Sequence, residues 1–395
     1  MTKYKQIHLK KGKEESLKRF HPWIFSGAIS YMDDGIEEGE LVSVITYSGD
    51  FIAIGHYQIG SIAVRILSFK DTDIDDNFWC ERLVSAFKLR KAIGVADNPH
   101  NTIYRLVHGE GDNLPGLVID CYNDTAVVQA HSVGMHVCRH VICDALVQVM
   151  QPRIKHVFYK SETTLPYKAD LRQENGFLFG GTDDNVAKEN GLQFYVDWLK
   201  GQKTGFFVDQ RDNRALLEKY ASGRKVLNMF CYTGGFSVYA MRGGAEIVHS
   251  VDSSAKAIEL TNRNIELNFP ADDRHKAFCE DAFKFLDSNE NMYDMIVLDP
   301  PAFAKHRMAL RNALKGYTRL NAKGFRCIKK GGILLTFSCS QVVTKDNFRN
   351  AVFTAAAQAG REVRILHQLH QPADHPINIY HPEGEYLKGL LLYVE

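Results

Sequence analysis

The chain has 395 residues, of which 45% are hydrophobic and 24% charged, and its formal net charge is +1 at neutral pH. This length predicts two or three domains. The near-neutral net charge gives no overall positive potential that would by itself indicate a nucleic-acid partner. One basic face on a single domain is still compatible with that net charge. The cysteines include no CxxC pair, and the N-terminus lacks the apolar core of a signal peptide. We therefore expect no metal site, no membrane segment, and reduced thiols in the cytoplasm.

Residues 1–72 are predicted to form a small all-β domain. Short apolar runs at 41–47, 51–57 and 62–67 are separated by turns rich in Gly and Asp. That spacing is typical of a small barrel or sandwich rather than of a parallel sheet. A basic stretch precedes these runs, and composition alone leaves open whether it is a solvated face or a binding surface. Its cations are Lys3, Lys5, Lys10, Lys11, Lys13, Lys18 and Arg19.

Residues 73–185 are predicted to form a small α+β domain. An amphipathic helix at 75–93 comes first, and a hairpin-like segment follows, with strands at 102–107 and 117–120. A strand at 126–130, a helix at 135–150 and a strand at 156–159 complete the region. We expect its glycines at 109–116 to form turns rather than to contact a ligand.

Strand and helix alternate over residues 186–395, which predicts a doubly wound, Rossmann-like parallel sheet that is covered on both faces. A pair of closing strands joined by a loop predicts a reversed strand at one edge. The expected strands are 225–229, 247–251, 276–279, 293–298, 333–337, 361–366 and 389–394, and the expected helices are 235–242, 255–268, 282–286, 310–328 and 347–358.

Three features after successive strands of this region predict a nucleoside-type cofactor. The first strand leads into Gly234 and Gly235, which do not form the GxGxxG clamp of a dinucleotide site. Asp252 ends the second strand, where a carboxylate can accept from two ribose hydroxyls, and Asp281 follows the third, where it can accept from an adenine amino group. Each acid alone could be a helix N-cap. The three together favour S-adenosylmethionine over NAD.

Two further residues follow the next strands at the same predicted edge. Asp299 stands before Pro300 and Pro301, which stiffen the turn, and Cys339 follows the apolar run at 333–337. Ligands of open α/β sheets bind beyond the carboxyl ends of the strands, so Cys339 is a candidate nucleophile there. The competing interpretations are a structural turn for Asp299 and a packed strand-end residue for Cys339.

With these motifs, the whole chain resembles the class I S-adenosylmethionine-dependent methyltransferases. More narrowly, it is similar to the bacterial large-subunit ribosomal RNA cytosine-C5 methyltransferases that carry an N-terminal PUA domain. The segments that carry the resemblance are 21–29, 109–117 and 203–214. It implies large-subunit ribosomal RNA as the partner and RNA contacts by the N-terminal lysines. The sequence leaves open whether the chain forms a homodimer.

The resemblance also implies roles for individual residues. Cys339 is the expected nucleophile toward carbon 6 of cytosine, and Asp299 is expected to hydrogen-bond the pyrimidine edge beside the cofactor. Arg211 and Arg214 are expected to support the site. The implied cofactor contacts are Phe207, Asp209, Gln210, Asn228, Phe230, Gly234, Asp252, Asp281 and Asp299.

One departure from the wider pattern limits the prediction. Many RNA cytosine-C5 methyltransferases have a second cysteine after the fourth-strand acid, where this chain has Pro301 and Ala302. The subgroup that the chain resembles typically lacks this cysteine too, so the resemblance stands. The base that removes the carbon-5 proton is therefore unassigned. Two rival functions stay open: methylation of a base nitrogen through the Asp299 motif, and an RNA-binding or ribosome-assembly role without catalysis. A NAD oxidoreductase fits less well because of the loop glycines.

Overall fold

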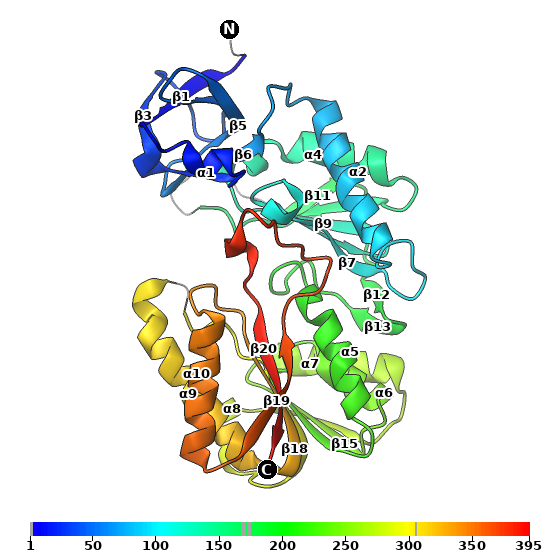
Figure 1. Cartoon of the computed structure of the whole chain (residues 1–395). Helices are drawn as coiled ribbons and strands as arrows, with labels where there is room; N and C mark the ends of the chain where they lie inside the picture. Colours follow the sequence, from blue (N-terminus) through cyan, green and yellow to red (C-terminus); the bar gives the residue numbers. More distant parts are fainter. Residues whose placement is uncertain (1–2, 167–170, 172–174, 305) are drawn as a thin grey trace. The chain divides into compact units, whose positions relative to one another are not determined.

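The computed structural model describes residues 3–166, 171, 175–304 and 306–395. The chain divides into two compact units (Figure 1). The first comprises Met1–Gly191, Val196–Val208 and Ala373–Gly384, and the second comprises Leu192–Tyr195, Asp209–Pro372 and Glu385–Glu395. The domain boundaries at 72 and 185 remain proposals. No helix in the described part of the chain is long and apolar enough to cross a membrane.

The N-terminal part of the first unit is a six-stranded sheet in the order β2-β6-β5-β4-β1-β3. The predicted strands are β4 (Leu41–Ile45), β5 (Phe51–Tyr57) and β6 (Ile62–Ser68); β1 (Lys5–Leu9), β2 (Trp23–Phe25) and β3 (Ile29–Met32) were not predicted. The basic stretch folds as β1 and the short helix α1 (Glu15–Lys18), with Ile7, Leu9 and Leu17 buried. The cations of this stretch therefore alternate with buried apolar side chains. The high charge of the stretch is the reason why these elements were not predicted.

The second part of this unit is a five-stranded sheet in the order β11-β10-β9-β8-β7. The strands are β7 (Ile103–His108), β8 (Leu117–Tyr122), β9 (Thr125–Ala130), β10 (His156–Tyr159) and β11 (Gly176–Phe179). Helices α2 (Asp76–Ala92), α3 (Val133–Val137) and α4 (Arg139–Met150) accompany it, and α2 and α4 contribute to its core. β12 (Val186–Glu189) ends the main segment of the unit. The predicted α+β arrangement is confirmed.

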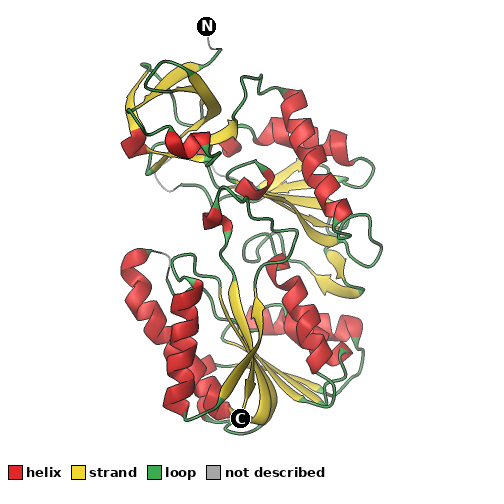
Figure 2. Ribbon diagram, viewed as in Figure 1, coloured by secondary structure: helices red, strands yellow, loops and turns green. Residues whose placement is uncertain are grey.

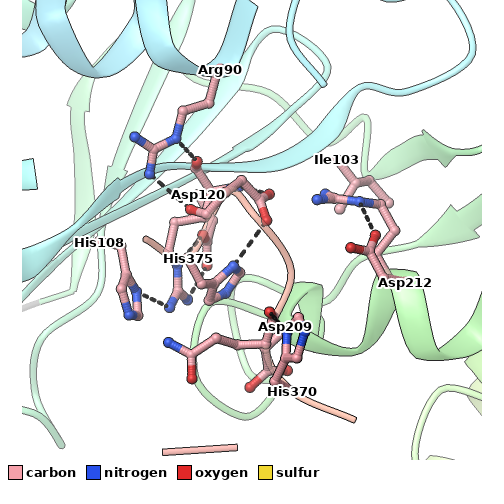
Figure 3. A network of polar contacts seen from close by, with 12 residues as sticks. Arg90, Ile103, His108, Asp120, Asp209, Asp212, His370 and His375 are labelled. Carbon is pink, nitrogen blue, oxygen red and sulfur yellow. Dashed lines mark hydrogen bonds and ion pairs between the residues drawn. The ribbon is translucent and has the colours of Figure 1, made fainter. Parts of the chain in front are cut away.

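A buried polar cluster ties the segment Ala373–Gly384 into the first unit (Figure 3). Arg90, which is 0% exposed, forms an ion pair with Asp112 and donates to the backbone oxygens of Arg105 at 2.7 Å and Asp374 at 2.8 Å. The carboxylate of Asp374 accepts from the Arg105 backbone at 3.0 Å. The Arg105 guanidinium in turn forms a bidentate pair with Asp120, at 2.8 and 2.9 Å.

The second unit contains the predicted doubly wound sheet, with seven strands in the order β16-β15-β14-β17-β18-β20-β19. Helices α8, α9 and α10 lie on one side of it and α5, α6 and α7 on the other (Figure 2). The strands are β14 (Lys225–Met229), β15 (Ile247–Asp252), β16 (His275–Cys279), β17 (Tyr293–Leu298), β18 (Ile328–Ser338), β19 (Val363–Leu369) and β20 (Lys388–Val394). The helices are α5 (Arg211–Tyr220), α6 (Gly235–Arg242), α7 (Ala255–Asn268), α8 (Ala282–Asp287), α9 (Leu310–Cys327) and α10 (Lys345–Ala359). Residues Leu192–Tyr195, strand β13, pack on α7.

The reversed strand of this sheet is β20, which runs antiparallel to both β18 and β19. It lies one place in from the edge, because β19 pairs along its outer side. The parallel register aligns Met229 with Val251 and with Leu298, and Leu298 with Thr336. The loops that follow β14, β15, β17 and β18 therefore all leave the same edge of the sheet.

Candidate functional site

The loop after β14 has a strained backbone that α7 holds in place. Phe230, Tyr232 and Gly234 have φ values of +58°, +47° and +74°. The Thr261 hydroxyl donates to the Tyr232 carbonyl at 2.9 Å, and a Cβ on Gly234 would lie 2.7 Å from Cγ2 of Thr261. Glycine is therefore required at 234 by both conformation and space. Strain that the surroundings fix in this way is a frequent feature of ligand-binding loops.

A buried polar chain lies beneath this loop. The Asn228 amide donates to the Ser237 hydroxyl at 2.9 Å, which hydrogen-bonds Ser250 at 2.7 Å, and Ser250 reaches Nε2 of His275 at 2.8 Å. These contacts join β14, α6, β15 and β16. Asn228 can thus shape the loop from below, and direct contact with a cofactor remains a proposal.

The two acids after the next strands have different surroundings. Asp252 is half-buried, and its two carboxylate oxygens accept from the backbone N–H groups of Tyr232 at 3.1 Å and Ser254 at 2.9 Å. Asp281 is exposed and caps α8, since its Oδ1 accepts from Phe283 and Lys284, both at 3.0 Å. The cap interpretation of Asp281 is therefore realised in the structure, while its contact with adenine remains a proposal.

Asp299 lies at the end of a chain of oriented amides. The Asn213 amide donates to Oε1 of Gln210 at 2.6 Å, which leaves Nε2 of Gln210 to donate to the Asp299 carboxylate at 3.0 Å. The neighbouring Asp209 is buried and accepts from the Tyr386 hydroxyl at 2.7 Å. Gln210 and Asn213 thus fix the direction of an acid that the sequence predicted only by its position.

The remaining predicted residues of the segment 203–214 lie outside this loop, and their support of the site remains a proposal. The Arg214 side chain is buried, and a Cβ on Gly235 would lie 3.0 Å from its Cδ, so the arginine stem covers the start of α6. Arg211 is also buried, with Nε 3.6 Å from Asp212. Phe207 belongs to the first unit, where the Lys203 ammonium lies 4.8 Å from its ring centroid. A place for Phe207 beside the cofactor remains a proposal.

Cys339 follows β18 between two buried serines. Ser338 donates to the Tyr317 hydroxyl at 2.9 Å, and burial raises the pKa of Tyr317 to about 12, so this phenol stays neutral. The Ser340 hydroxyl donates to the carbonyl of Ala304 and accepts from its N–H group. Ala304 belongs to the loop that begins with Asp299. The structure therefore ties the loop of the acid to the loop of the thiol.

Lys388 is a residue of this site that sequence reasoning missed. It is the cross-strand partner of Ser338, is 5% exposed, and its ammonium donates to the Ser340 carbonyl at 2.6 Å. Burial lowers the pKa of Lys388 to about 8, while the charges of Cys339 and Glu385 act in the opposite direction. The available signal was one lysine in an otherwise apolar closing strand, since buried lysines are rare unless they have a partner.

The backbone-lined loop and the Asp252 carboxylate fit S-adenosylmethionine. The loop turns at Gly234 without the spaced glycines of a diphosphate clamp, and the Asp252 carboxylate is held at the adjacent strand end by the Tyr232 N–H group. Among the residues described, no group of three His, Cys, Asp or Glu side chains could hold a metal ion.

Comparisons with known proteins agree with this architecture. A family model for S-adenosylmethionine-dependent methyltransferases matches residues 177–391, and one for PUA-like domains matches residues 7–69. Ribosomal RNA large subunit methyltransferase I of Tolumonas auensis is 42% identical over 98% of each chain, and that of Escherichia coli O157:H7 is 37% identical over 97% of this chain and 98% of its own. A solved structure of a putative methyltransferase from Streptococcus mutans shares the fold, with a TM-score of 0.85 at 23% identity over the full length of both chains.

Proposed function

Because this chain belongs to the S-adenosylmethionine-dependent methyltransferases and groups with ribosomal RNA large subunit methyltransferase I, we propose that it methylates carbon 5 of a cytosine in large-subunit ribosomal RNA. In this proposal Cys339 forms a covalent adduct with carbon 6 of the base. The observation that carries it is the position of the thiol, at a strand end and tied through Ser340 to the Asp299 loop. Cytoplasmic location and a homodimer remain predictions.

A thiol is needed because carbon 5 of cytosine is a poor nucleophile. The Cys339 thiolate adds to carbon 6, and the electron pair of the former carbon 5–carbon 6 double bond becomes available at carbon 5. S-adenosylmethionine, when bound, supplies an electrophilic methyl group. Loss of the carbon-5 proton to a base then restores the double bond, the carbon–sulfur bond breaks, and its electron pair returns to Cys339. The cytosine must be unpaired or flipped to reach the thiol.

Asp299 is suited to hold the polar edge of the base. Its carboxylate can accept from the exocyclic amine or from a protonated ring nitrogen, and Gln210 fixes its orientation through the bond at 3.0 Å. Addition of a thiolate to carbon 6 places negative charge on the ring, so a proton on ring nitrogen N3 favours the addition. A carboxylate that accepts a hydrogen bond from the protonated N3 favours that protonated form of the base. The same geometry favours the rival function, in which Asp299 would hold an amine that is itself methylated.

Mass-spectrometric mapping of ribosomal RNA from cells with and without the gene separates these functions. Loss of one 5-methylcytidine in the deletion strain is the expected result. Loss of a nitrogen-methylated nucleoside would contradict the cysteine mechanism and support the rival. A purified protein that binds no S-adenosylmethionine would instead favour an assembly factor without catalysis.

Lys388 is proposed to hold Cys339 as a thiolate, because a nearby cation favours the charged form of a thiol. In Lys388→Met, alkylation of Cys339 by iodoacetamide at pH 7 should slow by roughly tenfold, since an opposite charge within a few ångströms shifts a pKa by about one unit or more. The Lys388 ammonium loses its proton as pH rises through about 8, so the difference should vanish above that pH. The other charges that act on Lys388 are Glu385 and Lys345.

The alkylation rate of each cysteine is measured by peptide mass spectrometry across pH. The exposed Cys279 provides an internal reference in the same molecule, and Lys388→Arg should retain most of the effect. Identical pH profiles of Cys339 alkylation in the wild type and Lys388→Met would rule out that Lys388 stabilises the thiolate. That result would not bear on which atom of the base is methylated.

Asp252→Ala should weaken binding of S-adenosylhomocysteine by about 10- to 100-fold, because hydrogen bonds to a charged group contribute about 1.5–3 kcal/mol each. The substitution removes the proposed ribose acceptor and also the bonds that Asp252 accepts from Tyr232 and Ser254. Isothermal titration calorimetry measures the change. Asp273→Asn, at an exposed acid before β16, is the matched control; equal affinities of the two variants would contradict the assignment.

A further inference from the structure

Helix α9 concentrates positive charge in a chain whose net charge is only +1. Between Leu310 and Cys327 it has no acid, and its cations are Arg311, Lys315, Arg319, Lys323 and Arg326. The first four follow one another at intervals of four residues, so successive like charges share one face of the helix. Like-charge pairs at this spacing destabilise a helix. Because these charges destabilise the helix itself, their presence indicates that they interact with a partner outside the helix.

The charges on α9 are only partly neutralised within the protein. Lys323 forms an ion pair with Asp287, and the Arg319 guanidinium lies 4.8 Å from the ring centroid of Phe283. Arg311, Lys315 and Arg326 are exposed, and no carboxylate pairs with them in the part of the chain that the structure describes. Three cations therefore face solvent with their charge available to a partner.

Three cations of the N-terminal basic stretch are neutralised within the protein. Lys3 pairs with Asp73 at 2.7 Å, Lys5 with Glu40 at 3.1 Å, and Lys18 with Glu15 at 2.8 Å. Each of these lysines has a neighbouring carboxylate that offsets its charge. The other cations of the stretch, Lys10, Lys11, Lys13 and Arg19, are exposed. Helix α9 differs because four of its cations line a single groove.

These cations line a groove of about 530 Å³ between α9 and α10. Arg311, Lys315, Arg319 and Arg326 contribute one wall, and Thr354 and Gln358 of α10 contribute neutral hydrogen-bonding groups. Among the residues that the structure describes, no acid lines the groove. α9 and α10 lie side by side on one face of the sheet (Figure 1). The chemistry of this groove fits a run of phosphate groups, which need positive charge and hydrogen-bond donors.

We propose that the α9–α10 groove binds the phosphate backbone of the substrate RNA. The inference rests on the proposed function and names the surface through which the substrate would be held. α9 follows β17 and the Asp299 loop, so it begins at the edge of the sheet where Asp299 and Cys339 lie. Arg311 and Lys315 belong to the part of α9 closest in sequence to that edge. Phosphates bound there would position an RNA strand for entry of one base, without selecting its sequence.

The test compares the Arg311→Gln/Lys315→Gln double variant with Lys276→Gln/Lys330→Gln, which removes the same charge from exposed sites on other elements of the same unit. Affinity for a transcribed fragment of large-subunit ribosomal RNA is measured by fluorescence anisotropy at several salt concentrations. The α9 variant should bind roughly 10- to 30-fold more weakly at physiological salt, and the slope of log affinity against log salt should fall by about 1 to 2, because each lost phosphate contact reduces it by about 0.7–0.9. The control should bind like the wild type.

Two further readouts separate binding from folding and from chemistry. The thermal midpoint of the α9 variant should not fall, because the substitution relieves repulsion within the helix. An affinity and a salt slope unchanged from the wild type would overturn the inference, as would wild-type binding that does not depend on salt. Neither result bears on which atom is methylated. A product other than 5-methylcytidine would overturn the proposed function while leaving the assignment of the groove intact.

Discussion

Replacing Cys339 with alanine is expected to abolish methyl transfer, by roughly 10⁴-fold or more, because loss of a covalent nucleophile removes the pathway rather than one contact. Binding of S-adenosylhomocysteine should stay within about twofold of the wild type, since the proposed cofactor contacts lie on other loops. The strand end should keep its structure, because Ser338 and Ser340 are held by Tyr317 and Ala304. Transfer of a labelled methyl group to RNA and calorimetry of cofactor binding measure the two effects.

A trapping experiment gives an independent check on the same residue. RNA that contains 5-fluorocytosine offers no proton at carbon 5, so the adduct cannot resolve and should survive denaturing electrophoresis. The wild type should form this complex, and neither Cys339→Ala nor Cys339→Ser should. Substantial methylation by Cys339→Ala would contradict the covalent mechanism and leave base-nitrogen methylation as the better hypothesis.

The largest expected effect on stability is at Arg90. Arg90→Met should lower the free energy of unfolding of the first unit by about 3–5 kcal/mol, because removal of one partner leaves a buried charge without compensation. Asp112 would be that charge, since its side chain is 3% exposed. The backbone oxygens of Arg105 and Asp374 would also lose their donor. A packed apolar replacement at position 90 cannot satisfy these groups.

Urea unfolding followed by tryptophan fluorescence measures this change, because Trp23, Trp79 and Trp198 all belong to the first unit. The two units need not unfold together, so a probe confined to one of them is required. Arg153→Met is the matched control: its pair with Asp97 is exposed, and such pairs contribute about 0–1 kcal/mol. If both variants lost the same free energy of unfolding, burial of the Arg90–Asp112 pair would not explain its contribution to stability.

Local sequence patterns predicted the catalytic sheet because its strands are apolar runs that end in polar residues. The same patterns predicted element boundaries less well where polar residues or glycines interrupt the apolar run. β18 begins at Ile328 rather than at 333, since Lys329, Lys330 and the following glycines do not resemble a strand. The single helix expected at 135–150 is two, α3 and α4, which meet at Cys138. β1 was missed because only Ile7 and Leu9 of its five residues are buried apolar side chains.

The candidate site shows the same limit. Position after a strand predicted Asp252, Asp299 and Cys339 as neighbours at one edge, because parallel strands bring their carboxyl ends together. The partners that orient them come from distant segments. Gln210 is 89 residues from Asp299, and Lys388 is 48 residues from Ser340. The spacing of residues within one helix or strand cannot predict contacts between segments this far apart in the chain. The contact between Arg90 and Asp374, which are 284 residues apart, is another example.

The position of β20 has a consequence for synthesis of the protein. β20 comes after the other strands of this sheet in the chain, yet its place is inside the sheet, between β18 and β19. A nascent chain that is still being translated has β18 with an open edge and Cys339 without the lysine opposite Ser338. The lysine that we propose to activate Cys339 therefore takes its place only after β20 has been synthesised.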